Sequence, residues 1–191
     1  IRVALVGYTN VGKSTIMNKL SKSDVFAENK LFATLDSTYR TLNPDSKPPM
    51  VLIDTVGFIQ NRPNTLVEGF KTTLESALEA DLLIIVCDLS DPHYKKHLEV
   101  TQEVLSELNI KEKEQIVVFT KKDKIVDPFL PKIVMRNLQA SFLLSCLNDE
   151  DVSDLRNYII DYFLKKQKHF DLFVPYKDGD AQSKVLGNAN I

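Results

Sequence analysis

Short apolar runs alternate along this chain with longer amphipathic stretches. Continuous runs of β-branched and aliphatic residues are typical of strands that are covered on both faces of a sheet. By this criterion the sequence predicts five strands, at Arg2–Val6, Met50–Asp54, Leu82–Asp88, Gln115–Thr120 and Ser141–Ser145. A weaker sixth candidate, Tyr39–Asn43, stands directly before Pro44.

The stretches between these runs carry apolar residues every three or four positions, as on the buried face of a helix. The predicted helices are Lys13–Ser21, Asn64–Ala80, Tyr94–Leu108, Pro128–Gln139 and Val152–Lys166. Alternating strands and helices predict an α/β fold with a mainly parallel sheet of about six strands, right-handed crossovers and helices on both faces.

The pattern changes after Lys168. Residues 169–191 predict a short strand, a turn at Asp178–Asp180 and an interrupted helix. We therefore expect one domain over residues 1–168 and, over 169–191, the truncated start of a small C-terminal domain. Because the first residue is Ile1 and not Met, we also expect that the N-terminal part of a longer protein is missing.

Composition narrows the class of protein. Of the 191 residues 43% are hydrophobic, and the formal net charge is −2, so neither disorder nor a strong overall field toward nucleic acid or membrane is predicted. The longest apolar run, Leu82–Cys87, is too short to cross a bilayer. Cys87 and Cys146 lack metal-site spacing, which indicates reduced thiols and a cytoplasmic protein.

The sequence GYTNVGKST follows the first predicted strand and begins the first predicted helix. It fits the pattern G-x-x-x-x-G-K-S, in which glycines let successive N–H groups wrap an anion at a helix N-terminus. A glycine-rich turn that arose by chance would need neither a strand before it nor a helix after it. The presence of both favours a phosphate-binding loop over a chance turn. In such a loop Lys13 reaches the β- and γ-phosphates and the Ser14 hydroxyl binds Mg²⁺. The predicted phosphate-binding residues are Gly7, Tyr8, Thr9, Asn10, Val11, Gly12, Lys13, Ser14 and Thr15.

Asp54 ends a predicted strand and is followed by Thr55-Val56-Gly57. The carboxyl ends of parallel strands form the ligand-binding edge of such sheets. There Asp54 can hold Mg²⁺ through a water molecule, and the Gly57 amide can approach a γ-phosphate. Alone, an Asp at a strand end is structural as often as functional, but the upstream loop favours the binding role.

The strand Gln115–Thr120 leads into the four residues Thr120, Lys121, Lys122 and Asp123. They form a T-K-x-D version of the N-K-x-D element that reads guanine. A carboxylate at Asp123 accepts from both N1–H and the N2 amine of guanine, and adenine offers no such pair. The stem of Lys121 can cover the base. In isolation these residues would predict only a charged turn.

Two further features complete the predicted base site. Thr120 replaces the usual Asn, and we expect this to weaken a tie to the phosphate loop and to lower guanine affinity. Ser145, Cys146 and Leu147 follow the last predicted strand, where their backbone N–H groups could meet the guanine O6.

The chain thus contains four elements in the order GYTNVGKS, DTVG, TKKD and SCL. In this order they resemble the motifs of translation-factor-class GTPases, which are P-loop NTPases with a Ras-like G domain. Leu31–Arg40, LFATLDSTYR, resembles the first switch of the HflX family of ribosome-associated GTPases, and Asp54–Ile59 with residues 66–75 resembles its second switch. The resemblance covers nearly the whole chain.

The resemblance implies two nucleotide-dependent switches. The first comprises Phe32, Ala33, Thr34, Leu35 and Asp36, with Thr34 on Mg²⁺ and the γ-phosphate; the second comprises Asp54, Thr55, Val56, Gly57 and Phe58. GTP hydrolysis would convert the first switch from an ordered to a disordered loop. Ras-like enzymes have a Gln where this chain has Phe58, so intrinsic hydrolysis should be slow and partner-activated.

The resemblance also implies a function. We expect a GTPase that uses Mg²⁺ and associates, according to its nucleotide, with the large ribosomal subunit through the missing N-terminal domain; we expect a monomer. Asn10 resembles the K⁺-coordinating Asn of cation-activated relatives, although it could equally fix a turn. Two alternatives stay open: an NTPase that also uses ATP, and a nucleotide-gated RNA- or ribosome-binding module with negligible hydrolysis.

Overall fold

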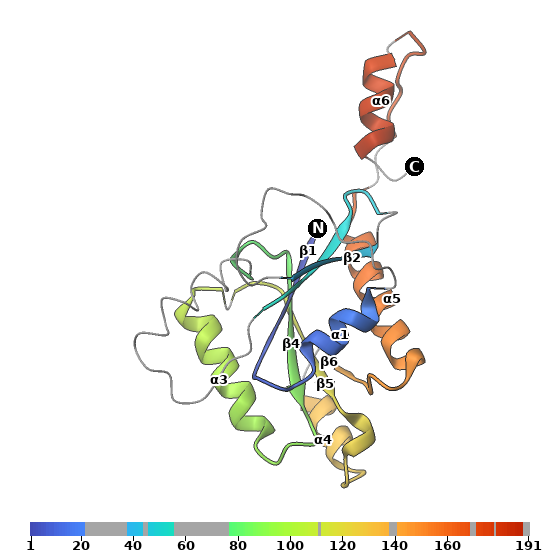
Figure 1. Cartoon of the computed structure of the whole chain (residues 1–191). Coiled ribbons are helices and arrows are strands. Elements are labelled where there is room, and N and C mark those ends of the chain that lie inside the picture. Colours follow the sequence, from blue (N-terminus) through green and yellow to red (C-terminus); the bar gives the residue numbers. More distant parts are fainter. Residues whose placement is uncertain are drawn as a thin grey trace.

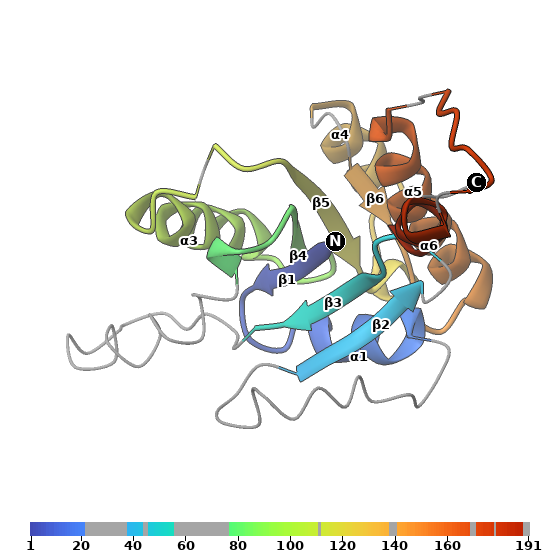
Figure 2. The same cartoon turned by 90° about the horizontal axis from the view of Figure 1, so that it is seen from above.

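The computed structural model describes residues 1–21, 38–43, 46–55, 77–110, 112–137, 141–168, 171–177 and 179–188. Within these ranges a six-stranded sheet has the order β2-β3-β1-β4-β5-β6 (Figure 2). Its strands are β1 (Arg2–Gly7), β2 (Thr38–Asn43), β3 (Met50–Asp54), β4 (Leu82–Asp88), β5 (Gln115–Thr120) and β6 (Ser141–Leu143). β2 pairs antiparallel with β3, and the other pairs are parallel. The predicted α/β fold with a mainly parallel sheet is confirmed.

Helices lie on both faces of this sheet (Figure 1). They are α1 (Lys13–Leu20), α3 (Tyr94–Glu107), α4 (Leu130–Asn137), α5 (Asp149–Lys166) and α6 (Gly179–Asn188), with a 3₁₀ turn, η1, at Lys122–Lys124. α5 begins three residues earlier than predicted, because the Asn148 side chain caps it by accepting a hydrogen bond from the Glu150 N–H. Of the predicted helix Asn64–Ala80, the described part is helical at Ala77 and Leu78.

Alternate residues of each strand pack against opposite helical layers. In β1, Val3 and Leu5 join a core with α1 and α5, whereas Ala4 and Val6 join a core with α3. Every residue of β4 is buried. This two-sided burial explains why the strands appear as unbroken apolar runs in the sequence.

The carboxyl ends of four parallel strands meet at one edge of the sheet. The register places Leu5 beside Asp54, Gly7 beside Val86, and Asp88 beside Thr120. The loops that follow β1, β3 and β5 therefore start close together, as predicted from their strand-end motifs.

The C-terminal segment differs from its prediction. The expected strand after Lys168 is wrong for residues 171–175, which form no strand; an extended segment without a neighbouring strand has nothing to pair with. The turn lies at Tyr176–Lys177, and α6 begins at Gly179 and runs without interruption. Figure 1 shows α6 beyond the layered body, where the Lys47 ammonium contacts the Leu186 carbonyl. No helix in the described ranges is long and apolar enough to span a membrane.

A substitution at Phe119 tests the core that supports the carboxyl edge of the sheet. Its side chain is fully buried on β5 and meets Tyr94 edge-to-face at a centroid distance of 6.5 Å. Phe119→Ala should lower the free energy of unfolding by about 3–5 kcal/mol through lost contacts and a cavity. The matched control Phe129→Ala, at a side chain that is 66% exposed, should change it by less than about 0.5 kcal/mol in urea denaturation. Similar losses in both variants would contradict this packing.

Candidate functional site

The loop after β1 approaches the neighbouring strand very closely. A Cβ added to Gly7 would lie 2.3 Å from the Val86 carbonyl oxygen, so no other residue fits there without a backbone shift. Gly12, with φ +102°, ends the loop as the N-cap of α1, and Asn10 has a left-handed φ of +59°. Val11 is buried in the core on the α1 side. The loop is thus anchored at both ends and turns outward at Thr9 and Asn10.

Lys13 folds back over this loop. Its ammonium donates to the carbonyls of Gly7, at 3.1 Å, and Tyr8, at 2.8 Å, and its side chain is nearly buried. Burial lowers the pKa of Lys13 to about 8, and the negative charge of Asp54 partly opposes that shift. The loop therefore holds a desolvated cation at a helix N-terminus, an environment that favours binding of an anion.

Ser14 and Asp54 meet in front of α1. The Ser14 hydroxyl donates to Asp54 Oδ2 at 2.6 Å, while Asp54 Oδ1 is buried without a partner among the described residues. A hydroxyl and a carboxylate with an unused oxygen are ligands that Mg²⁺ prefers, so these residues fit that ion. The Thr55 hydroxyl donates to the Leu5 carbonyl at 2.7 Å and fixes the end of β3 beside β1.

Thr120 joins the predicted base site to the phosphate loop. Its buried hydroxyl donates to the Val11 carbonyl at 2.7 Å, with the Cys87 carbonyl at 3.4 Å. The tie to the phosphate loop is therefore present with Thr120, and the expectation that it is weaker than with Asn stays a prediction. The Thr hydroxyl reaches the loop because β5 ends close to it, so a longer side chain is not needed.

Asp123 is held by the loop that follows β6. The Ser145 hydroxyl donates to Asp123 Oδ1 at 2.5 Å, and this hydrogen bond is the largest cause that keeps the pKa of Asp123 below its ordinary value. The carboxylate is exposed and ionised near neutral pH. Residues 22 positions apart in the chain thus form one acceptor site at the sheet edge.

Backbone donors in the loop of residues 145–147 are partly used. The Ser145 N–H donates to Asp151 Oδ2 at 2.8 Å, and the Leu147 N–H donates to the Ser145 hydroxyl at 3.2 Å. The Cys146 N–H has no hydrogen-bond partner within the described part of the chain. Of the three predicted residues, Cys146 therefore has the backbone N–H that is available to a ligand.

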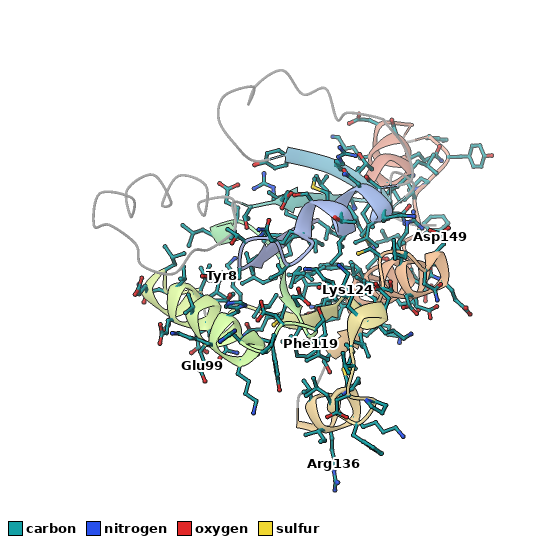
Figure 3. All side chains as sticks on the ribbon, turned by 60° about the horizontal axis from the view of Figure 1, so that its bottom comes forward. Tyr8, Glu99, Phe119, Lys124, Arg136 and Asp149 are labelled. Atoms are coloured by element: carbon teal, nitrogen blue, oxygen red, sulfur yellow. The ribbon has the colours of Figure 1, made fainter. Side chains whose placement is uncertain are left out.

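Three site residues escaped the sequence reasoning. Asp88 forms an ion pair with Lys121, and it carries the same signal as Asp54: a carboxylate that ends a buried strand at this edge. Asp151 contacts Lys122 and Ser145, one from each of the two base-site loops. His97 of α3 stacks on Tyr8 at a centroid distance of 4.0 Å and an interplanar angle of 10°. Figure 3 shows Tyr8 on the side of its loop that faces α3; no sequence pattern indicated this contact.

Part of the predicted site lies outside the described residues. This holds for Phe32, Ala33, Thr34, Leu35 and Asp36 of the first switch, and for Val56, Gly57 and Phe58 of the second. The described part of the predicted site therefore consists of the loop of residues 7–15, the Ser14–Asp54 pair and the two loops of the predicted base site.

A parallel sheet whose first strand leads into a glycine- and lysine-containing loop, with a Ser–Asp pair beside it, defines a P-loop nucleotide-binding domain of the GTPase type. A family model described as 50S ribosome-binding GTPase matches residues 2–121. The chain therefore belongs to the 50S ribosome-binding GTPase family, and its HflX relatives confirm the resemblance that the motifs predict.

Those relatives are proteins named GTPase HflX. The one from Gluconacetobacter diazotrophicus is 44% identical over the whole chain, which spans 42% of that relative. The one from Akkermansia muciniphila is 39% identical over 98% of the chain and 44% of the relative. A GTP-binding protein from Sulfolobus solfataricus, solved in complex with GDP, has a TM-score of 0.68 and 25% identity, covering 87% of this chain and 53% of that one. The chain thus spans less than half the length of these HflX relatives.

Thr120→Val tests the tie between the two loops. Loss of the hydroxyl leaves the Val11 carbonyl without this donor, which should cost about 1–3 kcal/mol of stability and weaken GDP binding about 10-fold by releasing the loop. Thr101→Val is the matched control, because the buried Thr101 hydroxyl donates at 2.8 Å to His97 within α3. It should lose little stability, because the His97 carbonyl keeps the helical N–H as a donor, and it should keep GDP affinity in calorimetry. Equal GDP affinity in the two variants would mean that Thr120 does not hold the phosphate loop.

Proposed function

We propose that the chain binds GTP with Mg²⁺ and hydrolyses it slowly to GDP and phosphate. The hydrogen bond from Thr120 to Val11 carries this proposal, because it fixes the base-site loop directly to the phosphate loop. One nucleotide can then be held by its base and its phosphates at the same time. Membership of a GTPase family and the GDP complex of the Sulfolobus protein support the same conclusion.

The phosphates are expected in the loop of residues 7–15. An anion there would replace the Gly7 and Tyr8 carbonyls as the partner of Lys13. Its negative charge would stabilise the Lys13 ammonium, which burial destabilises. Ser14 would turn its hydroxyl from Asp54 to Mg²⁺, and Asp54 would hold the ion through water. When bound, Mg²⁺ neutralises charge on the β- and γ-phosphates.

Guanine is expected at Asp123. Held at Oδ1 by Ser145, the carboxylate would accept the N1–H and the N2 amine through its two oxygens, and the Cys146 N–H is available for O6. Adenine would place an acceptor against the carboxylate and an amine against the N–H, leaving both unpaired. The pairing of the Lys121 ammonium with Asp88 leaves its aliphatic stem to cover the base plane.

Slow hydrolysis and a ribosomal partner complete the proposal. Phe58 has no group that can orient an attacking water, so an activating partner is needed. The family description supports the large ribosomal subunit as that partner, and we propose that the rest of a longer protein makes most of the contact. We further propose a cytoplasmic monomer.

Nucleotide hydrolysis tests the proposed reaction. The chain should hydrolyse GTP at least about 10-fold faster than ATP, and EDTA should stop the reaction. Ser14→Ala should lower the GTPase rate about 10- to 100-fold by removing a metal ligand, whereas Ser106→Ala, at an exposed position of α3, should not change it. Equal rates with ATP would favour the broader NTPase. If a full-length protein that contains this chain hydrolyses no GTP even when large ribosomal subunits are added, the reaction is ruled out and the nucleotide-gated binding module is the remaining function.

Potassium dependence tests the proposed role of Asn10. If its amide helps to hold K⁺ beside the phosphates, GTP hydrolysis should be at least about 10-fold faster in KCl than in NaCl. Asn10→Gly should abolish this difference without straining the loop, since glycine readily adopts the φ of +59° found there. Equal rates in the two salts for the unchanged chain would rule out the K⁺ site.

A further inference from the structure

Asp151 lies at the meeting point of the two base-site loops. It belongs to the first turn of α5, and only 14% of its side chain is exposed. Asp151 Oδ2 accepts the Ser145 N–H at 2.8 Å, and the Lys122 ammonium lies 3.0 Å from Oδ1 and 3.3 Å from Oδ2. One carboxylate therefore binds a donor from the loop after β6 and a donor from the loop after β5.

These contacts lead directly to the guanine-reading carboxylate. The Ser145 backbone is held by Asp151, and the Ser145 hydroxyl holds Asp123 Oδ1 at 2.5 Å. In addition, the Lys122 N–H donates to the Leu144 carbonyl at 3.3 Å, and this hydrogen bond joins the same two loops. The position of Asp123 is thus set through Ser145, and the position of Ser145 is set through Asp151.

Asp151 is not needed to cap its helix. The N-cap of α5 is Asn148, whose side chain accepts the Glu150 N–H at 2.9 Å. Asp149, at the beginning of α5 (Figure 3), pairs instead with Lys19 of α1. A carboxylate anywhere in this turn would gain from the helix dipole, but only one at Asp151 makes the two contacts with the base-site loops among the described residues.

We propose that Asp151 is a positioning residue that sets guanine selectivity by fixing Ser145 and Lys122 around Asp123. This inference rests on the proposed guanine site. Asp151→Asn keeps the shape of the side chain but removes its charge, and its amide cannot accept from both donors with the same strength. The Ser145 loop then loosens, and Asp123 loses the fixed orientation that pairs with both N1–H and the N2 amine.

The experiment compares GDP with IDP, whose hypoxanthine base lacks the N2 amine. The two diphosphates share their phosphates, ribose, N1–H and O6, so the ratio of their dissociation constants reports the contact between the N2 amine and Asp123. The unchanged chain should prefer GDP by about 10-fold or more, and Asp151→Asn should reduce that preference about 3- to 10-fold in calorimetric titrations. A merely structural role would weaken both ligands equally and leave the ratio unchanged.

Glu150→Gln is the matched control. It removes the same charge from the same helical turn at an exposed side chain and keeps the backbone cap at Asn148, so its GDP-to-IDP ratio should equal that of the unchanged chain. If the unchanged chain prefers GDP but Asp151→Asn retains the full ratio, the role of Asp151 is overturned and the guanine site stands. If the unchanged chain shows no preference for GDP, the guanine site and the role of Asp151 are both wrong.

Discussion

The buried hydrogen bond from the Thr120 hydroxyl to the Val11 carbonyl is the contact on which the site depends. It links the end of β5 to the loop after β1, so that the proposed base site and the proposed phosphate site share one edge of the sheet. The close approach of Gly7 to Val86 fixes the other end of the phosphate loop. Because both contacts are buried, water cannot replace them, and displacement of either loop would leave polar groups unsatisfied.

The same edge contains charged groups that the described residues do not satisfy fully. Lys13 is buried against carbonyl groups, and one oxygen of Asp54 is buried without a partner in the described part of the chain. Elsewhere the two cores are apolar and closely packed. A desolvated ammonium and an unused carboxylate oxygen side by side at the carboxyl edge of a parallel sheet are typical of a site whose ligand supplies the missing charge, which supports the proposed phosphate at Lys13 and divalent cation at Asp54.

The sequence predicted the parts of this structure that depend on local pattern. Buried strands such as β4 appear as apolar runs, and the phosphate loop is recognisable because its glycines, lysine and serine have fixed spacing. Contacts between side chains on different elements were missed: Tyr8 with His97, Lys121 with Asp88, and Ser145 with Asp151. These contacts depend on which strands are neighbours and on how helices pack on the sheet, and a local stretch of sequence determines neither. The strand predicted after Lys168 failed for a related reason, since pairing requires a neighbour.

A crystal structure of the chain with Mg²⁺ and GDP would test this account most directly. It should place the diphosphate in the loop from Gly7 to Thr15, with the Lys13 ammonium moved from the loop carbonyls to the β-phosphate. The guanine edge should meet the Asp123 carboxylate and the Cys146 N–H, with the Thr120–Val11 bond unchanged. A base bound away from Asp123, or a diphosphate outside the loop, would contradict the account.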